Sequence, residues 1–167
     1  MIVAKDIWAH APEIYADLVD ALDALRRNEK VGGSSLGAGG FSTGGYFAVR
    51  LAATGEVRAG VSYYSGPDFA RIDPALSRFR AVFTSDSAPV LLLFGTADPG
   101  ARVIPRIRPI LNAVHSPYEI SLYPDARHLF ERDLSTAANQ AAAGRRHGES
   151  RGSRLSPPIP DVSDQLK

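Results

Sequence analysis

The sequence contains no cysteine among its 167 residues. Disulfide bonds, thiolate nucleophiles and thiolate metal ligands are therefore excluded, and the absence fits a reducing compartment. No apolar run approaches the roughly 20 residues that span a bilayer. The first residues reach Lys5 and Asp6 too early to form the apolar segment of a secretion signal. These absences predict a soluble cytoplasmic protein with no membrane partner.

An excess of charge is also missing, because 19 basic residues stand against 18 acidic ones and the formal net charge is +1. This balance gives no electrostatic reason to expect nucleic acid or an anionic membrane surface as a partner. The histidines and carboxylates show no spacing that matches a metal-ligand set. We therefore expect no nucleic-acid partner, no metal and no cofactor.

The chain is long enough for one domain with a single hydrophobic core. From about residue 135 its apolar periodicity ends, and an alanine-rich stretch passes into arginine, glycine, serine and proline. Few large apolar residues remain there, which is typical of disordered segments. We expect a folded domain over residues 1–140 and a disordered tail over residues 141–167.

Helical and strand patterns alternate along the rest of the chain. Apolar residues at helical spacing predict helices over residues 11–30, from Ser42 to Thr54, and over residues 103–114. Strand patterns cover residues 31–41, 57–67, 88–100 and 118–123, while residues 68–87 are irregular or partly helical. The continuous apolar run from Val90 to Phe94 suits a central parallel strand. This order predicts an α/β fold with a mostly parallel sheet flanked by helices.

Glycines surround one serine in the segment GFSTGGYFA. Gly40, Ser42 and Gly44 match the pattern G-x-S-x-G, and Gly45 extends it. In a nucleophile elbow the chain turns sharply from a strand into a helix, which strains the serine and needs small neighbours. The turn would lift the Ser42 hydroxyl above the sheet, with the backbone N–H of Thr43 directed at a developing oxyanion.

Two alternatives compete with a catalytic Ser42. The glycines could mark only a tight loop, or they could form a phosphate-binding loop. The phosphate loop is disfavoured because the dinucleotide pattern G-x-G-x-x-G fails and no lysine follows Gly44 and Gly45, as a nucleotide-binding P-loop requires. A nucleotide-binding module is therefore the weakest of the functions considered.

A serine hydroxyl attacks only with help from a histidine base that a carboxylate orients. Asp98 directly follows the buried strand, in FGTADPG, and His128 follows the next strand, in YPDARHLF. Open α/β sheets place their sites at these carboxyl ends. The chain order of nucleophile, acid and histidine is also the one found with this elbow. We predict a catalytic triad of Ser42, Asp98 and His128.

Each partner has a structural alternative. An aspartate before Pro-Gly, such as Asp98, is often only a turn former. Asp86 and Asp125 are the other candidate acids, and Asp125 stands in a turn beside Pro124. The remaining histidines are assigned to the surface because of where they fall, before the elbow, at a helix end and in the tail: His10, His115 and His147. Four aromatic residues could line an acyl pocket, although core packing explains them equally well: Tyr46, Tyr63, Tyr64 and Phe130.

Three separated blocks, GFSTGGYFA, PVLLLFGTADPG and YPDARHLFERD, together resemble the α/β-hydrolase superfamily and, within it, the dienelactone hydrolase-like branch. The resemblance covers roughly residues 11–135. It implies a hydrolase of carboxylic esters or related acyl compounds, with a small-molecule substrate and no cofactor. That branch typically carries a cysteine nucleophile, so Ser42 implies a relative among the serine esterases, lipases or thioesterases.

The resemblance also implies that part of the fold has no counterpart. The family's sheet has eight strands with the elbow after the fifth, whereas only the helix over residues 11–30 precedes the elbow strand in this chain. We therefore expect a partial, N-terminally truncated fold that lacks the first four strands and the loop that supplies the second oxyanion donor. The elbow strand would then form an exposed edge, open to self-association. The competing hypothesis is a catalytically impaired fragment or pseudoenzyme of the same fold.

Overall fold

Four parallel strands form one sheet in the order β1-β2-β3-β4 in the computed structural model, which describes residues 9–31, 35–65 and 76–149. The strands, in chain order, are β1 (Ala38–Phe41), β2 (Gly60–Tyr63), β3 (Val90–Gly95) and β4 (Tyr118–Tyr123). The predicted α/β fold with a parallel sheet is confirmed. All four carboxyl ends therefore meet at one edge of the sheet.

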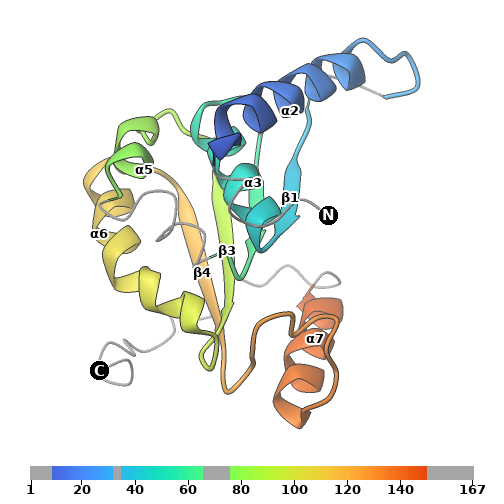
Figure 1. Cartoon of the computed structure of the whole chain (residues 1–167), viewed down its shortest axis with the longest axis vertical. Coiled ribbons are helices and arrows are strands. Elements are labelled where there is room, and N and C mark those ends of the chain that lie inside the picture. Colours follow the sequence, from blue (N-terminus) through green and yellow to red (C-terminus); the bar gives the residue numbers. More distant parts are fainter. Residues whose placement is uncertain (1–8, 32–34, 66–75, 150–167) are drawn as a thin grey trace.

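Helices precede the first strand, lie between successive strands and follow the last strand. The helices are α2 (Ala11–Arg26), α3 (Thr43–Ala53), α5 (Ser77–Val82), the 3₁₀ helix η1 (Pro99–Val103), α6 (Ile104–Ala113) and α7 (Ala137–Glu149). Helix α2 ends four residues before the predicted position because the Asn28 side chain accepts the backbone N–H of Lys30, which favours a turn. In Figure 1, α7 lies apart from the other helices.

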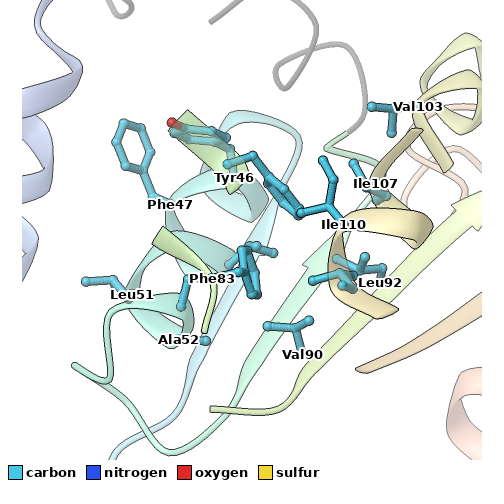
Figure 2. Close-up of a cluster of buried hydrophobic side chains, with 14 of the residues drawn as sticks. Tyr46, Phe47, Leu51, Ala52, Phe83, Val90, Leu92, Val103, Ile107 and Ile110 are labelled. Carbon is cyan, nitrogen blue, oxygen red and sulfur yellow. The ribbon is translucent and has the colours of Figure 1, made fainter. Parts of the chain in front are cut away.

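The hydrophobic clusters on the two faces of the sheet differ in size. Along β3, side chains alternate between the faces, so Leu92 packs in one hydrophobic cluster and Leu93 in another. The larger cluster joins α2, α3, α5 and α6 to the sheet, and Figure 2 shows it around Phe83 and Ile110. The smaller cluster includes Ala142 of α7 and lies beside the predicted histidine. Site and small cluster therefore share one side of the molecule.

Strand β1 lies at the edge of the sheet and, among the described residues, pairs with β2 alone. The edge predicted for the elbow strand is present. Phe41 at its end is 47% exposed, although it stacks on Tyr63 with ring centroids 4.8 Å apart. The strand has only four residues, fewer than the segment 31–41 predicted, of which residues 32–34 lie outside the described residues.

Helix α7 continues past residue 140, where we placed the end of the folded domain, and reaches Glu149. Residues 150–167 lie outside the described residues, so the tail expected there stays a prediction. In the parts of the chain that the structure describes, no helix has both the length and the apolar character that crossing a bilayer requires.

Candidate active site

Ser42 occupies the junction between β1 and α3. Its backbone has φ 49° and ψ −120°, a conformation that an L-residue adopts only under strain. The Ser42 N–H donates to the Tyr63 carbonyl at 2.9 Å, and the Ser42 carbonyl accepts the N–H of Gly45 at 2.9 Å. The strand, sharp turn and helix that the G-x-S-x-G pattern requires are thus all present. Thr43 begins α3, so its N–H lies at the positive end of the helix dipole.

The three glycines of the turn are not equivalent. A Cβ on Gly40 would lie 2.1 Å from the carbonyl oxygen of Gly44, and a Cβ on Gly45 would lie 2.6 Å from the Ser62 hydroxyl. Both contacts are far inside van der Waals distance, so these positions accept no side chain without movement. A Cβ on Gly44 would meet nothing within 4 Å. The close packing of the turn therefore requires glycine at positions 40 and 45, whereas position 44 has room for a side chain.

Asp98 follows β3, and its side chain is 1% exposed. One carboxylate oxygen, Oδ1, accepts the N–H of Gly100 at 2.8 Å and caps η1. The other oxygen, Oδ2, lies 2.8 Å from Nδ1 of His128. Asp98 is therefore a turn former and the partner of the histidine at once, because each role uses a different oxygen.

The loop after β4 brings His128 to Asp98. Its backbone is hydrogen-bonded to the loop after β3, with Thr96 N–H donating to Tyr123 and Ala97 N–H donating to Ala126, both at 3.0 Å. A Cβ on Gly95 would lie 2.1 Å from the Ala126 carbonyl oxygen, so the two loops touch only because residue 95 is a glycine. Because β3 and β4 are neighbours in the sheet, the loops that follow them lie together and bring Asp98 and His128 into contact.

The other candidate acids lie elsewhere. Asp125 has φ 56° in the turn after β4, is exposed, and uses its backbone N–H to bind the Thr96 hydroxyl at 2.8 Å. Asp86 is exposed in the turn before β3, at the opposite end of that strand from Asp98. Asp98 is the acid that the structure brings to His128.

Asn139 of α7 holds the histidine loop from both sides. It is fully buried; its Oδ1 accepts the N–H of Arg127 at 2.9 Å, and its Nδ2 donates to the Asp133 carbonyl at 2.7 Å. Our sequence analysis missed this residue. One pattern could have indicated it, because Asn139 is three positions from the buried Ala142 and thus lies on the apolar face of α7.

One of the four predicted aromatic residues, Tyr64, packs directly against the imidazole. Tyr64 is fully buried, and its ring centroid lies 4.5 Å from that of His128. Phe130 is buried beneath Tyr64 at 5.7 Å. Tyr46 packs in the larger cluster beside Phe47, which favours its core role (Figure 2).

Glu131 is the second residue that our sequence analysis missed at this site. Its Oε1 accepts the Tyr64 hydroxyl at 2.5 Å. Burial, reinforced by this hydrogen bond, raises the pKa of the Tyr64 hydroxyl far above its usual value, so the phenol is a neutral donor at physiological pH. Nothing in the residue pattern pointed to this pair.

Within residues 9–31, 35–65 and 76–149, no group of three or more histidine or acidic side chains has an arrangement that could hold a metal ion. The site residues described above are a hydroxyl, an imidazole and a buried carboxylate at the carboxyl edge of a parallel sheet. This combination of fold and site defines the α/β-hydrolase class.

Comparison with known proteins identifies the family. A family model described as the Dienelactone hydrolase family matches residues 2–150. Because that range is most of the chain, the protein belongs to the dienelactone hydrolase family, and the resemblance noted in the sequence is confirmed. A comparison with curated protein sequences finds no match.

Solved structures with a similar fold include a dienelactone hydrolase and related esterases. The dienelactone hydrolase from Anabaena variabilis is 31% identical, with a TM-score of 0.55 over 80% of this chain and 58% of that one. A dienelactone hydrolase-like promiscuous phosphotriesterase from metagenomic libraries has a TM-score of 0.64 at 21% identity, over 87% of this chain and 62% of that one. Thermogutta terrifontis esterase 2 has a TM-score of 0.54 at 18% identity, over 80% and 63%. The last two show the fold alone, and the chain spans 58% to 63% of these relatives' lengths.

Proposed function

We propose that the protein is a serine hydrolase that cleaves carboxylic esters or related acyl compounds through an acyl-enzyme intermediate. The observation that carries the proposal is the contact between the buried Asp98 carboxylate and Nδ1 of His128. A neutral imidazole that donates from Nδ1 has its basic lone pair on Nε2. That nitrogen is the one that takes the proton of a serine in hydrolases of this type.

The proposed reaction has two stages. In the first, Ser42 Oγ attacks the acyl carbon while His128 accepts the hydroxyl proton, and the proton then passes to the departing alcohol. In the second, water attacks the acyl-serine, His128 takes a proton from that water, and the acid is released as the proton returns to Ser42. Asp98 stabilises the imidazolium in both stages. The Thr43 N–H would stabilise the oxyanion, a type of contact whose loss typically costs about 10²–10³ in turnover.

A serine-directed fluorophosphonate probe tests the proposal on the purified chain. We expect covalent labelling of the native protein and no labelling of Ser42→Ala. Ser85→Ala is the matched control, since Ser85 is exposed in the turn before β3, and its labelling should equal that of the native chain. If a chain shown to be folded by circular dichroism fails to label, the proposal is wrong and an impaired member of the fold is indicated.

We also propose that two copies of the chain associate through the outer edge of β1. The support is the edge position of β1, whose outer side pairs with no other strand among residues 9–31, 35–65 and 76–149 and could accept a further strand.

A further inference from the structure

Tyr64 packs against the imidazole ring of His128. It follows β2, directly beside the turn that carries Ser42, and its ring is tilted by 58° against the His128 imidazole at 4.5 Å between centroids. Phe130 packs on Tyr64 edge-on, at 77° and 5.7 Å. The imidazole therefore contacts Asp98 through Nδ1 and Tyr64 through its ring.

The Tyr64 ring is fixed at both ends. At the backbone, Tyr64 has φ 43°, a strained value for a bulky residue, and its N–H donates to the Leu93 carbonyl at 2.8 Å. At the other end, the hydroxyl donates to Glu131. Strain of this kind persists only where the surroundings impose it, and it concentrates at functional sites. A ring held in this way leaves the imidazole little freedom to turn.

Glu131 is only partly satisfied by this contact. Its second oxygen, Oε2, is buried and has no hydrogen-bond partner among the described residues. A buried carboxylate oxygen without a donor is costly, so its presence asks for an explanation. The Tyr64 hydroxyl donates to Oε1, so the Glu131 carboxylate is the acceptor of the pair. Glu131 is thereby linked to the histidine through the Tyr64 ring, and an ionised carboxylate near an imidazole favours its protonated form.

We propose that Tyr64 and Glu131 act as a positioning pair that holds the His128 imidazole against Asp98 and stabilises it when it carries the serine proton. The inference deepens the proposed function and rests on it, since it assumes His128 to be the base. A cation beside an aromatic ring is attracted by the ring's quadrupole. A carboxylate hydrogen-bonded to the phenol increases that attraction by adding electron density. Tyr64 and Glu131 thus support the imidazolium from its ring, while Asp98 supports it from Nδ1.

The other charged groups near the pair have a smaller effect. The positive charge of Arg132 acts on the Tyr64 hydroxyl in the opposite sense to Glu131, but the Arg132 side chain is exposed. Arg127, which precedes the histidine, is also exposed. Charges in contact with water are screened far more than buried ones. The Asp98 side chain and the Oε2 atom of Glu131 are buried instead, so the charges of these carboxylates would be screened least.

Two conservative substitutions separate charge from packing. Glu131→Gln keeps an oxygen that can accept the Tyr64 hydroxyl but removes the charge, and Tyr64→Phe keeps the ring but removes the hydrogen bond. Glu119→Gln is the matched control, because Glu119 is an exposed carboxylate on β4. The readout is the titration of the His128 imidazole by nuclear magnetic resonance, assigned with His128→Gln, alongside the pH profile of fluorophosphonate labelling.

We expect the titration midpoint of His128 to fall in Glu131→Gln by roughly 0.5 to 1 pH unit, less than the effect of about 1 to 3 units typical of an opposite charge in direct contact, because Glu131 acts through the Tyr64 ring. Tyr64→Phe should shift it in the same direction by less, and Glu119→Gln should leave it unchanged. The acidic limb of the labelling profile should move to lower pH in parallel. An unchanged midpoint in both folded variants, or a shift to higher pH, overturns the inference.

The two proposals can fail separately. If the native chain labels with the probe but His128 titrates identically in all variants, the pair has no such role and the proposed function stands. If the midpoint shifts as expected but the native chain does not label, the pair supports the histidine of a site that does not react. In that case the proposed function is wrong.

Discussion

The two halves of the proposed catalytic site, a nucleophile half around Ser42 and an acid–base half around Asp98 and His128, are built in different ways. The nucleophile half lies on β1, a four-residue strand at the edge of the sheet, and depends on glycines within a few residues of Ser42. The acid–base half lies on β3 and β4, strands of six residues each, whose loops are joined by hydrogen bonds and held by α7. Local chain geometry positions the serine, whereas contacts between distant segments position the acid and the histidine.

The largest effect is expected in the acid–base half, from Asp98→Asn. Asparagine keeps an oxygen for the Gly100 N–H but no longer holds Nδ1 of His128 with a charge. Labelling should fall by about 10⁴, the size of the effect when an orienting aspartate of this kind is replaced. Asp125→Asn is the control, since Asp125 is exposed and tolerates the change at φ 56°. Equal loss in both variants would contradict the assignment of the acid.

The next largest effect is expected from Gly40→Ala, which disrupts the turn that carries Ser42. Gly40→Ala places a methyl group 2.1 Å from the Gly44 carbonyl, which is backbone and cannot rotate away. We expect a loss of about 3 kcal/mol in the free energy of unfolding, at the upper end for overpacking, together with a loss of labelling. Gly44→Ala is the matched control because nothing lies within 4 Å of its added methyl.

In urea titrations Gly44→Ala should lie within about 1 kcal/mol of the native chain, since alanine is the better helix former by about that amount. If Gly40→Ala is as stable as Gly44→Ala, the close approach in the turn does not exist. The pair of variants thus tests whether the serine is positioned by local geometry.

A smaller effect is expected from removing the link between α7 and the histidine loop. Asn139→Ala leaves the Arg127 N–H and the Asp133 carbonyl without their partner, which costs about 2 kcal/mol of unfolding free energy when such groups stay buried. Labelling should slow while the far-ultraviolet circular dichroism stays native. Gln140→Ala, at the exposed neighbouring position, should change the unfolding free energy by less than about 0.5 kcal/mol.

The smallest effect concerns the edge of β1 and appears only at high protein concentration. Ala38 and Ser42 donate their N–H groups toward β2, so Gly39 directs its own away from the sheet. Gly39→Lys adds a charge where a Cβ meets nothing within 4 Å. We expect weaker self-association in sedimentation velocity, with Gly44→Lys as the control. A native chain that stays monomeric at every concentration would rule out the edge contact.

Most of the helices and strands could be predicted from the sequence because they depend on local patterns of apolar residues. The apolar run of β3 and the alternation of β4 follow directly from side-chain periodicity, and β4 has the predicted bounds. The helices α3 and α6 agree with the predicted ranges to within one residue at each end, whereas α2 ends early beside the Asn28 side-chain hydrogen bond, which periodicity does not reveal. The short β1 differs for a similar reason, because the glycines before it have little preference for a strand.

The sequence by itself determined the order of serine, acid and histidine and the strand-turn-helix around Ser42, because these depend on residues adjacent in the chain. Only the tertiary structure decided which acid meets His128, which glycines the turn requires, and that the Tyr64 ring packs against the imidazole. It also decided that Asn139 holds the histidine loop and that Glu131 accepts the Tyr64 hydroxyl. Those contacts join segments up to 67 residues apart. They form because neighbouring parallel strands bring their carboxyl ends together, a consequence of sheet order that no short stretch of sequence encodes.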